Sequence, residues 1–334
     1  MKRNCLYITY DGLLDPLGKS QIIPYLNLIA KDTERLFILS FEKKNNRHLH
    51  FNHKKEILPE NVFIKQLEFS ERFGLLGKIY DLGKMYFCST YICLKYNIAI
   101  IHARGHPPAI NAFILKKTLF FRSLKYIFDF RGLWVDERID KGSWDIDKLT
   151  HRIQFRIFKA LERLLISYSD AIVVLTDAMK HELFSLGFVK KNIEVIPCCC
   201  NFNKFRIDSE SYSSIRNAMN IGSDTILLGY IGSVGPMYDF KCMFKFFQEN
   251  CKFESKLHLL LLTNSNQKAK NIALKYLKPD IMNKLTFSSV DHSEVPKYLA
   301  ALDASIFFLK ESYARLGTSP TKFGESLASG VPVI

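Results

Sequence analysis

The chain has 334 residues, of which 48% are apolar and 24% charged, as is usual for a globular protein of about two domains. Lys and Arg number 47 against 33 Asp and Glu, so the net charge of +14 favours anionic partners. The sequence carries no zinc-finger, homeodomain or RNA-recognition signature, which argues against nucleic acid. We therefore expect a phosphorylated substrate or an anionic membrane surface as the partner.

The amino-terminal apolar run ends at Asp11, too early for the core of a signal peptide. No stretch reaches the ~18 apolar residues of a membrane span. The eight Cys form no CxxC pair, and residues 198–200 alternate in direction when extended, so they do not converge on a metal. We expect reduced thiols, no metal site, and a cytoplasmic protein that meets a membrane only peripherally.

The first half of the chain alternates strands with helices. A strand over 5–10 leads into a glycine-bearing loop over 11–20 and a helix over 21–30. The further strands are expected at 36–41, 62–67, 99–103, 126–130, 171–175 and 193–196, and the further helices at 75–96 and 151–168.

Residues 201–224 lose this periodicity and gain Ser, Asn and charge, which is typical of a linker. The alternation then restarts and predicts an α/β fold with parallel sheets covered by helices. We expect two Rossmann-like domains, at 1–200 and 225–334, facing a cleft lined by strand carboxyl ends. The later strands are expected at 226–231, 257–263, 285–287 and 304–309, and the helices at 240–249, 267–277 and 293–302.

The last sixteen residues, 319–334, hold the most informative pattern. Ser319 suits a helix N-cap, Pro320 suits the first helical position, and Gly330 suits the helix end. The apolar residues 331–334 then predict a strand. Because that strand stops at the end of the chain, we expect the second domain to be incomplete.

Lys322 and Glu325 share one face at the start of this helix. A helix N-terminus beside a Lys suits a phosphate, and a Glu one turn further on can accept hydrogen bonds from a sugar diol. The segment 229–235 adds Gly232 and Ser233, whose backbone amides can approach a diphosphate. These residues together predict a site for a phosphorylated sugar or nucleotide.

Three further clusters follow strands of the first half. Gly18 and Lys19 lie in the first loop, which contacts phosphate or sugar or is a surface turn. His102 and His106 flank an Arg. They either line the cleft or belong to a loop whose polar groups are hydrogen-bonded within the protein.

The third cluster is the segment 129–137, which crowds acid, base, glycine and aromatic residues after a strand. Asp129 or Arg131 at the strand tip can contact a substrate hydroxyl, and Trp134 can stack on a sugar ring. The alternative is an Asp–Arg pair that braces a loop.

With these residues assembled, the chain resembles glycosyltransferase family 4, whose members are retaining enzymes of the GT-B fold. The resemblance implies transfer of a sugar from a UDP- or GDP-linked donor to a cell-surface glycan or lipid-linked acceptor, with no metal or other cofactor. The second domain would bind the nucleotide and the first the acceptor. The resemblance is carried by 15–21, 129–137, 170–176, 195–197 and, above all, 319–325 with 330–334.

In this family a Glu at the place of Glu325 holds the ribose, and residues at the places of Ser319, Thr321 and Lys322 lie near the diphosphate. We expect these four residues to bind the donor with Gly232 and Ser233. The expected catalytic groups are Asp129, Arg131 and His106, and the expected acceptor or loop contacts are Gly18, Lys19, His102 and Trp134.

The chain departs from the family at two places. Gly317 stands where the family has a Glu that meets the donor sugar. Ser233 and Tyr238 stand near the family's phosphate-binding Arg and Lys, which leaves Lys241 or Lys322 to supply the positive charge.

Two other functions stay open. A non-hydrolysing nucleotide-sugar epimerase shares the architecture, and His102 with His106 could serve its acid–base chemistry. An inactive, truncated remnant is the other alternative. Separately, Lys116, Lys117 and Arg122 are interleaved with Phe and Leu, which predicts a membrane-facing patch or, equally, a solvated helix face.

Overall fold

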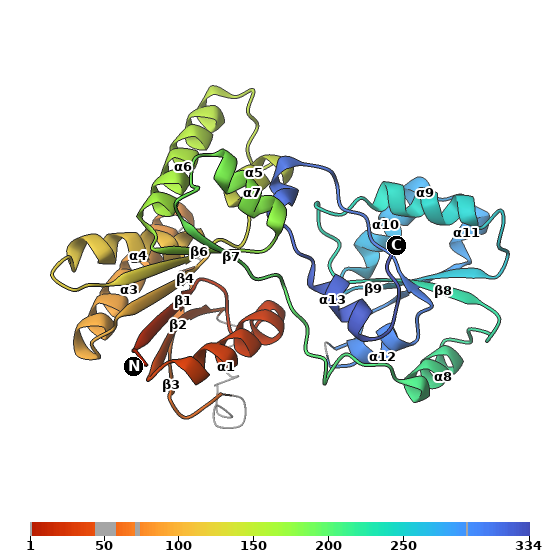
Figure 1. Ribbon diagram of the computed structural model, residues 1–334. Coiled ribbons are helices and arrows are strands. Elements are labelled where there is room, and N and C mark those ends of the chain that lie inside the picture. Colours follow the sequence, from red (N-terminus) through yellow and green to blue (C-terminus); the bar gives the residue numbers. More distant parts are fainter. Residues whose placement is uncertain (1, 44–57, 71–73, 292) are drawn as a thin grey trace. The chain divides into compact units, whose positions relative to one another are not determined.

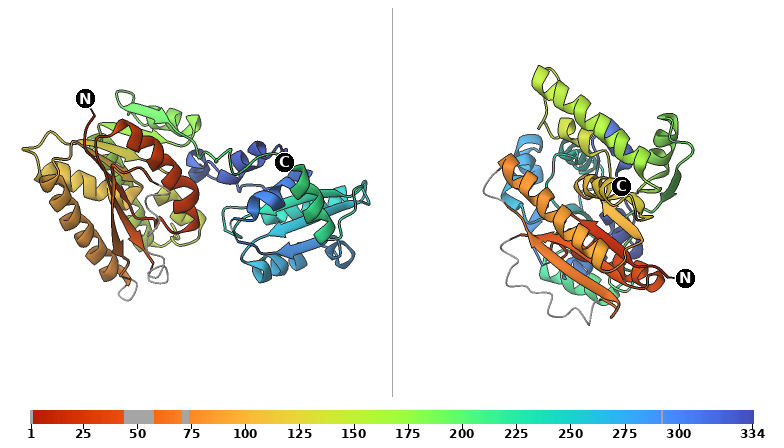
Figure 2. Two further views of the ribbon diagram at one scale, coloured as in Figure 1. Left: turned by 90° about the horizontal axis from the view of Figure 1, so that it is seen from below. Right: turned by 90° about the vertical axis from the view of Figure 1, so that its left-hand side faces the viewer.

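The computed structural model describes residues 2–43, 58–70, 74–291 and 293–334, and the chain divides into two compact units (Figure 1, Figure 2). Unit 1 comprises Met1–Pro197 with Leu316–Thr318, and unit 2 comprises Cys198–Arg315 with Ser319–Ile334. Each unit is built on its own parallel sheet, so the predicted α/β class is confirmed.

Unit 1 has a seven-stranded parallel sheet in the order β3-β2-β1-β4-β5-β6-β7. Its central strands are continuous apolar runs because helices cover both faces, and every residue of β1 and β2 is buried. The strands are β1 (Cys5–Thr9), β2 (Leu36–Glu42), β3 (Val62–Glu68), β4 (Ile100–Arg104), β5 (Lys125–Asp129), β6 (Ala171–Val174) and β7 (Asn192–Val195).

The helices of unit 1 lie on both faces of this sheet. Helix α1 covers one face, while α3 and α4 lie side by side on the other and α4 also contacts α6 (Figure 2). These elements are η1 (Gly18–Ile22), α1 (Ile23–Asp32), α3 (Gly74–Lys95), α4 (His106–Thr118), α5 (Trp134–Asp140), α6 (Leu149–Tyr168) and α7 (Asp177–Ser185).

Helices α4, α5 and α7 were not expected from the sequence. Helix α4 begins with a His-Pro-Pro run that reads as a loop, yet Pro is compatible with the first helical turn, where backbone N–H groups need no partner within the helix. Helices α5 and α7 have only seven and nine residues, too few for a clear apolar period.

Unit 2 has a four-stranded parallel sheet in the order β10-β9-β8-β11. Its apolar core combines β8 and β9 with the Phe-rich face of α9, which contributes Phe240, Phe244 and Phe247. The elements are α8 (Ser209–Ala218), β8 (Ile226–Ile231), α9 (Phe240–Asn250), β9 (Leu257–Leu262), α10 (Asn266–Tyr276), α11 (Pro279–Met282), β10 (Leu285–Ser288), α12 (Val295–Ala300), β11 (Ala304–Ser305), η4 (Tyr313–Gly317) and α13 (Thr321–Ala328).

Residues 201–224 are part of unit 2, and the expectation of an irregular linker there is corrected. Asp208 caps α8 by accepting a hydrogen bond from the backbone of Ser211 at 3.0 Å. Arg216 of the same helix is buried and donates to Asp303 at 2.9 Å, which ties α8 to the sheet edge. The chain passes from unit 1 to unit 2 after Pro197, slightly before the predicted boundary.

The last two predicted strands are shorter in the structure than the sequence indicated. The strand predicted at 304–309 narrows to Ala304–Ser305, because the backbone from Phe307 to Lys310 bonds loop residues instead. Val333 forms a parallel bridge with Ser305, so the predicted terminal strand is present as a single bridge beside β11.

A tight contact within unit 2 generates a stability prediction. A methyl group on Gly229 would lie 2.3 Å from Leu302 Cδ1, inside the second apolar cluster of the unit. We expect Gly229→Ala to lower the free energy of unfolding of unit 2 by about 1–3 kcal/mol through overpacking. Urea unfolding followed by circular dichroism measures this change.

Gly235→Ala is the matched control, because its new methyl group would have its nearest neighbour at 4.0 Å. We expect that variant to differ from the parent by less than about 1 kcal/mol. Equal unfolding midpoints for the two variants would contradict the packing described here.

Candidate functional site

Unit 2 places a glycine turn directly after β8. Gly232 has a φ of +137°, a conformation that residues with a side chain rarely adopt. A Cβ on Gly232 would lie 2.9 Å from Lys322 Nζ, so the missing side chain also makes room for this lysine. Gly232 and Lys322 are 90 positions apart, and the fold brings them close together, while their role in one binding site stays a prediction.

Lys322 lies in the first turn of α13, inside an aromatic box formed by Tyr230, Tyr238 and Phe307. Its Nζ is 4.0 Å from the ring centroids of both tyrosines and 5.3 Å from that of Phe307. This Nζ is buried and has no hydrogen-bond partner among the described residues. Cation–π attraction therefore holds the ammonium in a position where no carboxylate of the described residues forms an ion pair with it.

The charge of Lys322 is poised to change near neutral pH. Burial lowers the pKa of Lys322 to about 7, although the nearby Glu325 carboxylate opposes the shift. Burial raises the pKa of Glu325, against the effect of Lys322 and Lys204. A buried ammonium and a buried carboxyl one helical turn apart are suited to an anion and a hydroxyl-bearing group, respectively.

The other residues predicted to bind the donor are Thr321, Ser233 and Ser319. Thr321 opens α13, and Ser233 is exposed beside Gly232, with its carbonyl accepting a hydrogen bond from Tyr230 Oη at 2.6 Å. Ser319 is not the N-cap, because its Oγ accepts a hydrogen bond from the backbone of Cys198 at 3.2 Å and Pro320 occupies the cap position. That expectation is therefore wrong, while its role in donor binding stays a prediction.

The aromatic box was missed by the sequence analysis. Tyr230 precedes Gly232 by two residues in β8, and Tyr238 was noted only as standing where the family has a Lys. The structure places the Lys322 ammonium over that same tyrosine ring, which favours Lys322 over Lys241 as the source of positive charge.

In unit 1, Asp129 is completely buried at the carboxyl end of β5. Its carboxylate lies 3.4 Å from Arg131, 3.6 Å from Arg104 and 3.6 Å from His102 Nε2. Burial alone would raise the pKa of Asp129, but Arg131, His102 and Arg104 together lower it below its usual value. The carboxylate is thus held ionised in the core of unit 1.

His102 and Arg104 join this cluster from the neighbouring strand β4. The His102 ring packs against Tyr7 and Tyr25, with centroids 4.9 and 5.6 Å apart. His102 Nε2 and Asp129 Oδ2 have no hydrogen-bond partner among the described residues, because their separation of 3.6 Å exceeds hydrogen-bond distance. The cluster therefore has unused hydrogen-bonding capacity.

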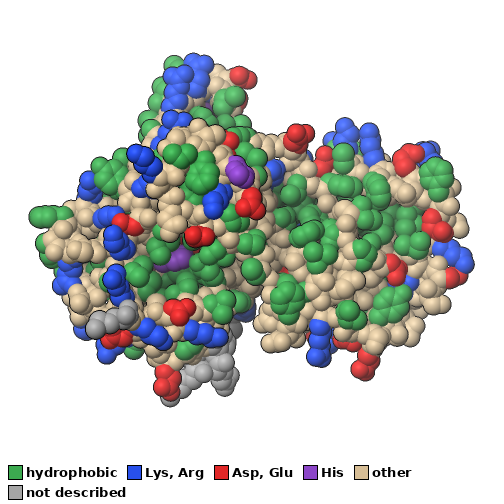
Figure 3. All heavy atoms as spheres, in the orientation of Figure 1, with side chains coloured by type: hydrophobic (Ala, Val, Ile, Leu, Met, Phe, Trp, Pro, Cys, Tyr) green, Lys and Arg blue, Asp and Glu red, His purple; other side chains and the backbone are tan. Residues whose placement is uncertain are grey.

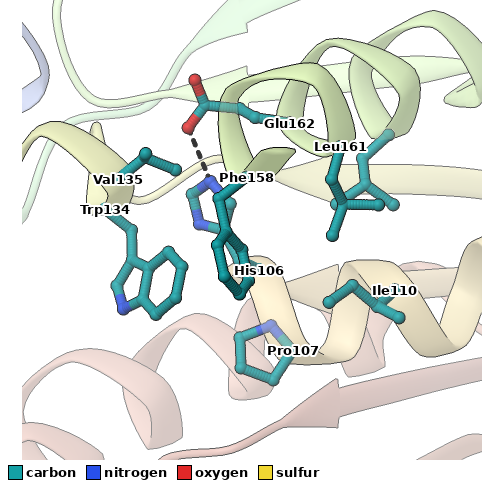
Figure 4. Close-up of a pocket in the computed structure, with 9 residues that line it drawn as sticks. His106, Pro107, Ile110, Trp134, Val135, Phe158, Leu161 and Glu162 are labelled. Carbon is teal, nitrogen blue, oxygen red and sulfur yellow. Dashed lines mark hydrogen bonds and ion pairs between the residues drawn. The ribbon is translucent and has the colours of Figure 1, made fainter. Parts of the chain in front are cut away.

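His106 belongs to a different cluster from Asp129. It opens α4, and its Nε2 lies 2.9 Å from Glu162 Oε2 of α6 (Figure 4). Glu162 also accepts a hydrogen bond from Lys159 at 2.7 Å. Burial would raise the pKa of Glu162, but His106 and Lys159 lower it. His102, rather than His106, is the histidine beside Asp129, and no signal in the sequence separates the two.

Trp134 opens α5 and lies in an aromatic cluster around His106. Its ring is 5.5 Å from His106, 6.3 Å from Trp144 and 5.6 Å from Phe158, between ring centroids. The Arg138 guanidinium lies 4.7 Å from the same ring. The indole lines a cavity, and stacking on a sugar stays a prediction.

The first loop is held in shape by close backbone packing. A Cβ on Gly18 would lie 2.1 Å from the carbonyl oxygen of Gly12, so only glycine fits there. The backbone N–H of Leu13 donates to Glu42 at 2.7 Å, while the Lys19 side chain is exposed. The loop is thus rigidly anchored, and its contact with a ligand stays a prediction.

Gly317 also lies in a confined position. It belongs to unit 1, where a Cβ would lie 3.1 Å from the Cα of Gly132. The backbone at this point leaves little room for the Glu that the family carries there.

The described residues include no group of three or more His, Cys, Asp or Glu arranged to hold a metal ion. Nor does any described helix combine the length and apolar character needed to span a bilayer.

The Asp129 cluster generates a prediction on stability and its pH dependence. Asp129→Asn leaves Arg104 and Arg131 without their buried anion, and we expect a loss of about 3–5 kcal/mol at pH 7. Since the pKa of Asp129 is lowered in the folded state, its contribution is present above about pH 4 and is lost as the pH falls further. Urea unfolding at pH 7 and in acid measures both effects.

Asp145→Asn provides the control, because this exposed carboxylate lies 3.9 Å from Lys148 and such pairs contribute about 0–1 kcal/mol. The difference between the parent and Asp129→Asn should shrink in acid. A difference that stays constant with pH would show that Asp129 acts by shape rather than by charge.

Residues 67–204 match the family model described as Glycosyltransferase Family 4. The chain is 22% identical over 209 residues to the Bacillus subtilis (strain 168) protein named "Putative teichuronic acid biosynthesis glycosyltransferase TuaH". That alignment covers 62% of this chain and 49% of TuaH, so the chain spans about half the length of this relative.

Solved structures share the fold over nearly the whole chain. HepE of Anabaena, crystallised with UDP and glucose, has a TM-score of 0.67 at 13% identity, covering 99% of this chain and 80% of HepE. WaaG, a glycosyltransferase involved in lipopolysaccharide biosynthesis, has a TM-score of 0.62 at 12% identity, covering 98% of this chain and 80% of WaaG. The match to the model of glycosyltransferase family 4 covers residues 67–204, and the two parallel-sheet units of the chain have the GT-B fold.

Proposed function

We propose that this chain transfers a sugar, with retention, from a UDP- or GDP-linked donor to a cell-surface glycan or a lipid-linked acceptor. The observation that carries the proposal is the buried Lys322 ammonium, which lies behind Gly232 without a hydrogen-bond partner among the described residues and has Glu325 one turn further along α13. The family match and the UDP and UDP-glucose in the HepE structures support a nucleotide-sugar as the donor.

In this proposal unit 2 binds the donor. The diphosphate lies against the N-terminus of α13 and the turn at Gly232, and Glu325 accepts hydrogen bonds from the ribose. As the bond to the sugar breaks, negative charge builds on the departing diphosphate while the sugar becomes cationic. Protonated Lys322 and the helix N-terminus stabilise that charge, so we expect no metal ion to be required.

Unit 1 binds the acceptor in the same proposal. Asp129 is held ionised by Arg131, Arg104 and His102, and within this cluster the partly exposed Arg131 side chain can orient an acceptor hydroxyl. The acceptor hydroxyl attacks on the face that the diphosphate leaves and gives its proton to the departing diphosphate, which retains the anomeric configuration without a protein nucleophile. His106 and Trp134 lie in a separate aromatic cluster. In this proposal they contact the acceptor and do not pair with Asp129.

The localisation follows from the substrates in this proposal. A nucleotide-sugar donor places the reaction in the cytoplasm, at the inner face of a membrane when the acceptor is a lipid. The predicted membrane patch stays a prediction, because Lys116 pairs with Asp170 at 2.5 Å and Arg122 donates to Asn97 at 2.7 Å. On the face of unit 1 that Figure 3 shows, basic side chains are dispersed among hydrophobic ones.

The donor site is tested by thermal unfolding with UDP, GDP, CMP and NAD. A ligand that binds only the folded protein raises the midpoint, by the equivalent of about 2.7 kcal/mol at one hundred times Kd. We expect UDP or GDP to raise it and Glu325→Ala to remove most of the shift. Glu311→Ala, an exposed carboxylate of the same unit outside the proposed site, should keep the shift.

Product analysis without acceptor then separates the two enzyme classes. A transferase leaves the nucleotide-sugar intact or hydrolyses it slowly, whereas an epimerase converts the donor to its stereoisomer. No shift with any nucleotide would overturn the proposed donor site and favour an inactive chain.

The low pKa of Lys322 generates a second prediction. We expect the affinity for UDP to fall by roughly tenfold as the pH rises from 7 to 9, because the free protein loses the Lys322 proton near pH 7. Binding above pH 7 should therefore take up a proton, which calorimetry in buffers of different ionisation enthalpy measures.

Lys322→Met is the control, since it keeps an apolar stem in the aromatic box and removes the titrating group. That variant should bind UDP more weakly at pH 6, with a smaller dependence on pH that reflects UDP itself. Identical pH profiles for the two proteins would exclude Lys322 as the phosphate partner.

A further inference from the structure

Unit 1 contains a pocket of about 440 Å³ that shares no residue with the Asp129 cluster. This volume falls in the range of about 300–1,000 Å³ that is usual for small-molecule sites. Its apolar walls come from α3, α4, α5 and α6, and they include Ile79, Leu82, Ile110, Trp134 and Phe158. Four of its residues also line the small cavity beside the His106–Glu162 pair (Figure 4).

The lining of the pocket is mainly apolar. Its polar members are Gln154, the two cations Lys78 and Arg138, and Tyr10, whose hydroxyl already donates to Asp81 at 3.1 Å. A sugar in this pocket would leave most of its own hydroxyls without hydrogen-bond partners, which is costly when they are buried. An alkyl or prenyl chain has no such requirement and gains from contact with these walls.

Two cations line the same pocket. Lys78 is exposed on α3, and the Arg138 guanidinium lies over the Trp134 ring at 4.7 Å. The hydrogen-bond and ion-pair geometry of the described residues gives Lys78 no acidic partner. The pocket thus offers an apolar interior together with positive charge, which complements a molecule that has an apolar chain and an anionic head.

Apolar surface also continues outside the pocket along α3. Leu76, Tyr80, Phe87 and Tyr91 are spaced at helical intervals and are each more than half exposed, at 71%, 63%, 74% and 57%. Ile79, which lines the pocket, lies on the same helix and is itself 58% exposed. An apolar chain longer than the pocket would therefore find further apolar contacts on α3.

We propose that this pocket holds the apolar chain of a lipid phosphate, with the phosphate paired to Lys78 and Arg138. The lipid phosphate would be the part of the acceptor that carries the glycan, and this assignment rests on the proposed function of the chain. It narrows the acceptor class from glycans in general to those linked through phosphate to an alkyl or prenyl chain.

The two Trp residues of the chain, Trp134 and Trp144, both line this pocket, so intrinsic fluorescence reports its occupancy directly. The protein is titrated with decyl phosphate below its micelle concentration, with decanol, with inorganic phosphate and with maltotriose. We expect a saturable change in Trp emission with decyl phosphate, a weaker one with decanol, and none with phosphate or maltotriose. A response to maltotriose alone, or no response to decyl phosphate, would overturn the proposal.

Matched variants locate the site. Ile79→Glu places a charge in the pocket wall and should weaken decyl phosphate binding at least tenfold, whereas Leu28→Glu, which has a similar exposure (60% against 58%) but lies on α1 outside the pocket, should bind normally. Arg138→Gln with Lys78→Gln should weaken decyl phosphate severalfold and leave decanol unchanged. Equal losses of affinity in Ile79→Glu and Leu28→Glu would contradict the assignment to this pocket.

This measurement requires no nucleotide, so its outcome is separate from that of the donor test. Stabilisation by UDP with no Trp response to decyl phosphate would rule out the proposed lipid site and support the proposed transferase function. A Trp response with no nucleotide binding would support the proposed lipid site and rule out the proposed donor site.

Discussion

Asp129 is completely buried at the end of β5, and its negative charge has to be balanced inside unit 1. The parallel arrangement of the strands supplies the balance, because β4 ends beside β5 and brings Arg104 and His102 to the same edge. Arg131 follows β5 itself. A carboxylate held ionised by these neighbours therefore brings the polar side chains of two strands and one loop together at this end of the sheet.

Unit 2 differs from unit 1 in the sign of its buried charge. It buries an ammonium rather than a carboxylate, and it surrounds Lys322 with aromatic rings instead of anions. The consequence is a lowered pKa and a charge that is available to an incoming ligand. In the proposed function this arrangement replaces the phosphate-binding Arg and Lys of the family, whose places are taken by Ser233 and Tyr238.

The apolar pocket adds a third kind of environment to the chain. It lies between helices rather than at strand ends, and its lining combines two Trp with two cations. The His106–Glu162 pair lies at a cavity that shares part of this lining, which links the pocket to a residue that the sequence analysis assigned to catalysis. The proposed lipid phosphate gives the aromatic cluster around Trp134 a role in acceptor choice.

The sequence by itself determined the α/β class, most strands to within a residue or two, and the resemblance to glycosyltransferase family 4. Those features depend on local periodicity and on short motifs such as 319–325, which the chain carries whatever its partners are. It also predicted that Lys322, Glu325 and Gly232 contribute to one site, and the fold brings Gly232 close to Lys322. It did not predict α4 or α8, because a His-Pro-Pro run and a polar segment resemble loops until tertiary contacts select the helix.

Only the tertiary structure decided which side chains meet. His102 and His106 are equivalent in the sequence, yet one lies beside Asp129 and the other bonds Glu162, 56 positions away. The aromatic box around Lys322 combines residues from three separate segments, and the apolar pocket draws its walls from four helices. Such groupings depend on distances between elements remote in sequence, and no local pattern records those distances.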